Sequence, residues 1–191
     1  MAAQTATVKP QVRVLVYASG RIPGKVLRAA EAETIRIFHA GGISLDWVNC
    51  SGRGSTGECE LSADWNQFIL HIVPKGKTSS DSVYGEAFLG EDEKGKYADV
   101  FFDRIEYAHR DSGIDEAELL GAVAAHEIGH LLLGLHAHSW SGIMSPVWAR
   151  EGLRRVSTGN LFFSREEIAH IKERVQRDDT TMSTLHAKAN N

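Results

Sequence analysis

The sequence predicts a mixed α/β (α+β) fold built as one domain. Val12, Val14 and Val16 alternate with other residues in a strand-like run. Residues 68–73 form a continuous apolar run of the kind found in buried strands. A helix-compatible apolar stretch ends near residue 133. With 191 residues and 42% hydrophobic content, the chain can bury a core of its own.

The first half of the chain predicts three strands and one helix. An approximate helical stripe of apolar residues covers 25–39, and Gly41 with Gly42 stops it. Pro74 and Gly76 end the buried apolar run. The expected elements are strand 12–17, helix 25–39, strand 43–48 and strand 68–73.

The second half begins with a hairpin-like pair of strands. Residues 83–89 and 97–102 flank a charged turn, which is typical of paired strands joined by a solvated loop. Asp115, followed three residues later by a glutamate, is a capping-box-like signal for a helix that runs to about Leu133. Gly134 is expected to end this helix in the left-handed conformation.

The domain organisation follows from the ends of these patterns. Ser164 and Glu167 repeat the capping signal for a last helix over 165–177. The chain contains no internal repeat and no convincing linker. We expect an N-terminal extension over 1–10, a single domain over 11–177, and a polar, disordered tail over 178–191.

Charge and composition limit the partners. A formal net charge of −4 with mixed signs argues against nucleic acid or an anionic membrane. No apolar run approaches the ~18 residues of a membrane span. Residues 1–10 lack a signal-type hydrophobic segment, yet their Ala/Thr-rich composition resembles the region after a cleavage site. We expect a secreted or periplasmic monomer, with the cytoplasm as the alternative location.

The two cysteines are predicted to form a disulfide. Cys50 and Cys59 enclose a segment rich in glycine and serine, which is flexible enough to close. Such a bond would stabilise the fold by about 2–3 kcal/mol. The alternative is a pair of free thiols in a cytosolic protein.

Residues 126–144 carry most of the functional information. His126 and His130 are four residues apart, so a helix places them on the same face. Two imidazoles at this spacing can hold one metal ion, and Glu127 beside them can reach a water on that ion. Two further histidines, His136 and His138, follow. The chain has no glycine-rich phosphate loop or G-x-S-x-G motif, and its cysteines lack metal-type spacing.

These residues resemble the metzincins, a group of zinc metallopeptidases among the zincins. The family motif is H-E-x-x-H-x-x-G-x-x-H, followed by a tight turn that contains a methionine. His126, Glu127 and His130 match the motif, and Met144 within 142–146 matches the methionine turn. The resemblance covers about 12–146 and is strong only over its last twenty residues. The stretch with Gly-His-Leu-Leu-Leu-Gly, Ala-His-Ser and Gly-Ile-Met is also similar to an uncharacterised bacterial branch of metzincin-like proteins.

The resemblance implies a zincin-like fold. This is a small twisted mixed sheet with an antiparallel edge strand, a backing helix, an active-site helix, a methionine turn and a C-terminal helix. In metzincins the edge strand pairs with an extended peptide substrate. The matching residues here are Tyr84, Gly85, Glu86, Ala87 and Phe88. Strand alternation leaves open that Phe88 points into the core instead.

The third ligand departs from the family pattern. The motif's glycine position is occupied by Leu133, and Gly134 comes one residue late. Strict counting gives His136 as the third ligand. We favour His138, because Ser139 follows it and because the bacterial branch has its histidine there. The other histidine is then an exposed loop residue or a hydrogen-bond partner of one of the ligands.

The function implied by this resemblance is a zinc-dependent endopeptidase with one catalytic zinc ion and Glu127 as general base for an activated water. Its partner would be a peptide or protein substrate. One alternative is an inactive, zinc-stabilised binding domain. Another is a zincin hydrolase whose third ligand is a glutamate, Glu166 or Glu167.

For the other residues considered, a structural role is expected more than a functional one. His71 lies within an apolar strand and is expected to pack there. Trp140 and Trp148 flank the methionine turn and either line a pocket or belong to the core or a lid. Asp103 and Arg104 are expected at a solvated strand edge.

Overall fold

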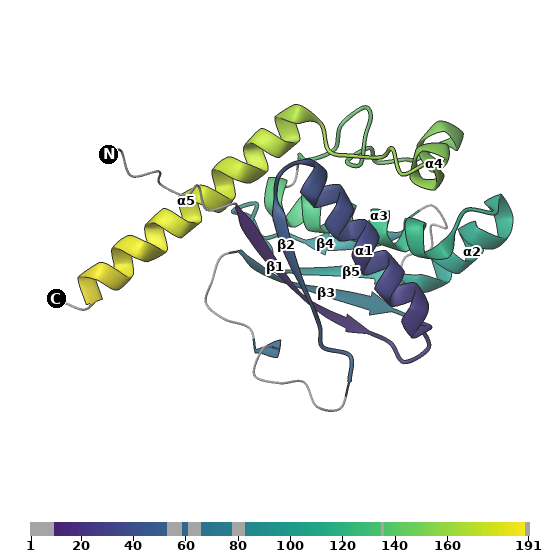
Figure 1. The fold of residues 1–191 in the computed structure, drawn as a ribbon, viewed down its shortest axis with the longest axis horizontal. Coiled ribbons are helices and arrows are strands. Elements are labelled where there is room, and N and C mark those ends of the chain that lie inside the picture. The colour runs from purple at the N-terminus through teal and green to yellow at the C-terminus, as the bar shows by residue number, and fades with distance from the viewer. Residues whose placement is uncertain (1–9, 53–58, 61–65, 78–82, 135, 190–191) are drawn as a thin grey trace, which may run out of the picture.

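The computed structural model describes residues 10–52, 59–60, 66–77, 83–134 and 136–189, with side chains in the last helix up to residue 177. A mixed sheet forms the centre of the molecule (Figure 1). Its strands are β1 (Gln11–Ala18), β2 (Ser44–Asn49), β3 (Gln67–Val73), β4 (Gly85–Phe88) and β5 (Tyr97–Phe101), in the spatial order β2-β1-β3-β5-β4. The mixed α/β prediction is therefore confirmed.

Strand direction separates one edge of the sheet from the rest. β2, β1, β3 and β5 are parallel to their neighbours, whereas β4 pairs antiparallel with β5. The predicted hairpin-like pair is thus present, and β4 forms the antiparallel edge of the described sheet. The charged segment between the two strands is exposed over residues 90–94.

The helices are α1 (Gly24–Ala40), α2 (Phe102–Ser112), α3 (Glu116–Leu133), α4 (Arg150–Ser157) and α5 (Arg165–Ala189). α1 and α3 pack against each other over the same face of the sheet, as Figure 1 shows. Thr34 joins them, because its buried hydroxyl donates to the carbonyl oxygen of Ala30 at 2.9 Å and contacts that of Gly121 at 3.0 Å. A Cβ at Gly121 would lie 2.7 Å from Ala30 O, so the missing side chain lets the helices approach closely.

Some elements differ from the sequence-based expectations. α2 and α4 were not predicted, because their buried positions are few and their remaining residues are strongly polar. The expectation of a solvated strand edge at Asp103 and Arg104 is wrong, since both lie in the first turn of α2. Gly134 has φ +94° and ψ −169°, which is not the left-handed helical conformation. The last helix also continues past Arg177 to Ala189.

The other face of the sheet carries a smaller core. Leu15, Ile69 and Cys50 pack together there, and Cys50 forms a disulfide with Cys59. Tyr17 donates from its hydroxyl to the carbonyl oxygen of Cys59 at 3.1 Å. The disulfide and this hydrogen bond hold Cys59 next to this face of the sheet.

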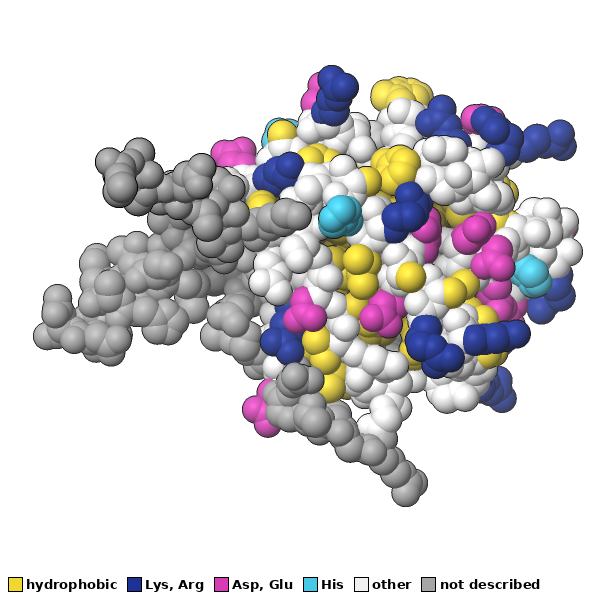
Figure 2. All heavy atoms as spheres, in the orientation of Figure 1, with side chains coloured by type: hydrophobic (Ala, Val, Ile, Leu, Met, Phe, Trp, Pro, Cys, Tyr) yellow, Lys and Arg dark blue, Asp and Glu magenta, His cyan; other side chains and the backbone are white. Residues whose placement is uncertain are grey.

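The surface mixes charges of both signs. On the face shown in Figure 2, Lys and Arg side chains alternate with Asp and Glu, and hydrophobic side chains are scattered between them. No helix in the described part of the chain combines the length and apolar character needed to cross a membrane.

Enlarging Gly121 tests the contact between α1 and α3. Gly121→Ala should lower the free energy of unfolding by about 1–3 kcal/mol, because the new methyl group meets backbone and the helices must separate. Gly20→Ala is the matched control, since a Cβ there meets nothing within 4 Å. Urea denaturation measures both. Equal stabilities of the two variants would contradict the close packing described here.

Candidate metal centre

Helix α3 positions the first two histidines of the site. Asp115 caps its start, because one carboxylate oxygen accepts hydrogen bonds from the N–H groups of Ala117 at 2.9 Å and Glu118 at 3.1 Å. The helix is buried along most of its length. His126 and His130 therefore occupy consecutive turns of a rigid element, on the same face.

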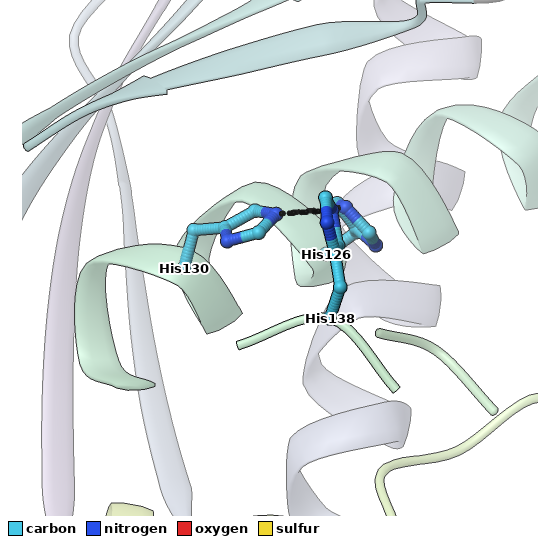
Figure 3. A group of neighbouring side chains, drawn as sticks. All are labelled: His126, His130 and His138. Atoms are coloured by element: carbon cyan, nitrogen blue, oxygen red, sulfur yellow. Dashed lines mark hydrogen bonds between the residues drawn. The ribbon is translucent and has the colours of Figure 1, made fainter. Parts of the chain in front are cut away.

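His138 completes a group of three imidazoles. It lies in the loop after α3, and its ring turns back toward the two helix histidines (Figure 3). Nε2 of His130 is 3.0 Å from Nε2 of His126 and 3.1 Å from Nε2 of His138. The group thus offers three converging nitrogen atoms, all within 4.8 Å of one another.

The protonation pattern of these rings suits a metal ion. Nδ1 of His126 lies 2.7 Å from the carbonyl oxygen of Ile143, and His130 hydrogen bonds to the backbone of Gly134. A carbonyl oxygen only accepts, so these ring nitrogens carry hydrogen, and each neutral ring presents a lone pair at Nε2. Burial lowers the pKa of His126 and of His130 to about 4, which disfavours additional protons. Lone pairs facing one another at this distance fit a shared cation.

A tight turn after His138 contacts the site through the carbonyl group of Ile143. Gly142 has φ +84°, and the next residue, Ile143, donates its N–H to the carbonyl oxygen of Phe162 at 2.9 Å. Met144 accepts at its carbonyl oxygen from the N–H of Ser139 at 3.0 Å. The turn is therefore held from two sides, and this fixes the Ile143 carbonyl group that orients His126.

Met144 packs against α3 at Gly129, the residue before His130. Its side chain is fully buried, and a Cβ at Gly129 would lie 2.5 Å from its sulfur atom. The glycine between Glu127 and His130 thus lets the turn approach the helix. Sequence reasoning missed this role of Gly129 and the carbonyl group of Ile143, although the glycine within the H-E-x-G-H stretch was a visible signal.

Glu127 points from α3 toward the edge strand. Its side chain is buried, and a Cβ at Gly85 would lie 2.6 Å from its Oε1 atom. Burial raises the pKa of Glu127 to about 8, and the nearby negative charge of Glu86 adds to the shift. A carboxyl group with such a pKa can both accept and release a proton near neutral pH.

A cleft of about 400 Å³ opens over these residues. The edge strand forms one wall, and residues 145–148 after the turn form another. Trp148 lines this cleft, and its ring packs against that of His126 with 5.7 Å between the centroids. Trp140, by contrast, is fully exposed. The full lining is Val83, Tyr84, Gly85, Glu86, Ala87, Leu89, Val123, His126, Glu127, His130, His138, Ser145, Pro146, Val147 and Trp148.

Other candidate residues lie apart from the three-histidine group. His136 is exposed and does not belong to it. Glu167 instead forms a capping box, in which its carboxylate accepts from the N–H of Ser164 at 2.7 Å. Glu166 is exposed and likewise outside the group. His71 is paired with Asp99 at 3.3 Å.

The orientation of the edge strand corrects one expectation. Phe88 is 43% exposed, so the alternative in which it points into the core is wrong. Ala87 and Leu89 pack against the main core instead. Strand alternation therefore places Gly85, Ala87 and Leu89 on the side of α3, and Glu86 with Phe88 on the opposite face.

Comparison with known proteins gives likenesses among solved structures. No family model matches the chain, and none of the curated proteins matches it. Its structure is similar to the crystal structure of an archaemetzincin from Methanopyrus kandleri, with a TM-score of 0.56 and 16% sequence identity. The similarity covers 87% of this chain and 97% of that chain. At this identity the likeness supports a metzincin-like zincin fold and says nothing further about activity.

The two loop histidines give a direct test of the metal centre. His138→Ala should lower zinc affinity by about tenfold or more, because one of three converging nitrogen atoms is lost. His136→Ala is the matched control and should retain wild-type affinity, since its side chain is outside the group. Competition with a chromogenic chelator measures both affinities. Loss of zinc in the His136 variant alone would refute the assignment of His138.

Glu127→Gln should change how the stability of the metal-free protein depends on pH. The folded pKa of about 8 lies above the ordinary value of 4.5, so the unfolded state releases a proton that the folded state keeps, and stability falls as pH rises through this window. Glutamine does not titrate, so the variant does not lose stability in this window. His126 and His130 have the opposite effect in both proteins. Their folded pKa of about 4 lies below the ordinary histidine value of 6.5, so they lower stability as pH drops.

Urea denaturation of chelator-treated protein at pH 5 and pH 8 measures this difference. The glutamine variant should gain on the order of a few kcal/mol over the wild type at pH 8, and much less at pH 5. Parallel pH profiles of the two proteins would show that the Glu127 carboxyl group has an ordinary pKa.

Proposed function

We propose that this chain is a zinc-dependent endopeptidase of metzincin type. The observation that carries the proposal is the convergence of three Nε2 atoms beside a buried glutamate, in a cleft bordered by an edge strand. His126, His130 and His138 would hold one zinc ion. When bound, zinc supplies Lewis-acid polarisation of the scissile carbonyl group and lowers the pKa of a water molecule.

Glu127 performs the proton transfers. Its carboxylate accepts a proton from the attacking water and then donates it to the departing amine nitrogen. The raised pKa supports this role, because a more basic carboxylate takes the proton more readily. Gly85 leaves space for the carboxylate between α3 and β4, so Glu127 faces the cleft where the peptide would lie.

The edge strand is suited to binding an extended peptide. Phe101 donates its N–H to the carbonyl oxygen of Tyr84 at 2.8 Å. In an antiparallel pair, residues whose backbone groups bond to the partner strand alternate with residues whose backbone groups face away from it. The backbone groups of Glu86 and Phe88 therefore face β5, whereas those of Gly85 and Ala87 face the open edge. A substrate would pair antiparallel with these two residues, largely independently of its side chains.

The turn with Met144 would be the methionine turn of this group, since its buried side chain packs against α3 at Gly129, next to His130. We also propose that the protein works as a monomer outside the cytoplasm, secreted or periplasmic. The disulfide between Cys50 and Cys59 supports this location, because disulfides persist in oxidising compartments.

Glu127→Gln separates catalysis from metal binding. The variant should keep one zinc ion per chain, since Glu127 does not belong to the ligand group, and lose peptide hydrolysis by about 10²-fold or more. Zinc is measured by elemental analysis, and cleavage by mass spectrometry of a diverse peptide library. His136→Ala serves as the control that should retain both. A zinc-loaded wild type that cleaves no peptide would instead favour the binding-domain alternative.

A further inference from the structure

The face of the sheet opposite α1 and α3 is polar and aromatic near β4. Cross-strand neighbours share a face, so the register assigns two rows of side chains to it. One row contains Phe88 and Tyr97, and continues inward through Ile69. The other contains Glu86 and Asp99, and continues through His71. Both rows end at the open edge of β4.

The first row ends in an exposed aromatic pair. Phe88 and Tyr97 lie directly opposite each other, and each is 43% exposed. Their inward neighbour Ile69 is buried, so the aromatic side chains extend the apolar surface to the edge of the sheet. An aromatic pair in this position offers apolar area to any strand added beside β4.

The second row ends in a negative charge. Asp99 is almost fully buried and pairs with Lys77 at 3.3 Å and with His71 at 3.3 Å, so its charge is balanced. Glu86 beside it is exposed at the edge. A strand added beside β4 would place one side chain next to this carboxylate, where a positive charge is favoured.

We infer that the enzyme selects peptides by their outward-facing side chains. The substrate would carry an aromatic or large aliphatic residue opposite Phe88 and a lysine or arginine opposite Glu86. This inference rests on the proposed function, in which the peptide pairs antiparallel with β4. It names a substrate class: extended peptides with an apolar residue followed, two positions later, by a basic residue.

The direction of the peptide places this pattern before the cleaved bond. In antiparallel pairing, the substrate residue opposite Phe88 precedes the residue opposite Glu86, which precedes the one opposite Gly85. Glu127 lies against Gly85, so the reacting carbonyl group is at that level of the strand. Both selected residues are therefore on the N-terminal side of the scissile bond.

Cleavage profiling with charge reversal tests the inference. The zinc-loaded wild type is incubated with a library of peptides, and matched peptides then compare lysine with glutamate at the predicted basic position. We expect kcat/KM to favour lysine by about fivefold, as a surface ion pair allows. Glu86→Lys should reverse this preference. Phe88→Ala should lower the preference for an aromatic residue over alanine at the earlier position by about fivefold.

Tyr107→Ala is the control, because Tyr107 is an exposed aromatic residue on α2 and not on the edge strand. It should leave both preferences unchanged. Ala87→Pro removes an edge-facing N–H and should lower the cleavage of all peptides alike. The wild type could cleave peptides with preferences that neither Glu86→Lys nor Phe88→Ala alters. That result would overturn this inference and leave the proposed function standing. Absence of any cleavage by the zinc-loaded wild type would overturn both.

Discussion

The hydrogen bond between His126 and the carbonyl group of Ile143 is the constraint on which the site depends. It joins the buried helix to a turn seventeen residues further along the chain. It also decides which ring nitrogen of His126 carries hydrogen, and so directs a lone pair toward the other two histidines. The turn can make this bond only because Gly142 adopts a positive φ and Phe162 accepts from the N–H of Ile143.

Three glycines allow the surrounding elements to reach α3. Gly121 admits α1, Gly129 admits the side chain of Met144, and Gly85 on β4 admits the carboxylate of Glu127. At each position a Cβ would come closer than 3.0 Å to a neighbouring atom. Close packing of this kind fixes the relative positions of helix, turn and edge strand, which a site of converging side chains requires. Helix α3 therefore carries two of these close contacts together with His126, Glu127 and His130.

Much of the fold was predictable because local patterns agree with it. The alternating valines of β1, the buried run of β3 and the cap at Asp115 are strong short-range signals, and the pair His126 and His130 follows from helical spacing alone. Helix α2 was missed because only Phe102, Ile105 and Ala108 face the core, among mostly polar residues. The close approach of Gly85 to Glu127 was not predictable, since it depends on contacts between distant segments.

The parallel sheet also has a consequence for the order of assembly. β1 pairs with β3 across more than fifty residues, and β3 pairs with β5 across almost thirty, so the sheet depends on non-local contacts that form slowly. The edge strand β4 pairs with β5 and so depends on this framework. A nascent chain in which only α3 has formed offers two nitrogen ligands, without the backbone carbonyl group that orients the first of them. Assembly of the three-histidine group is therefore coupled to completion of the tertiary structure, because His138 and the Ile143 carbonyl group reach the helix histidines only in the folded chain.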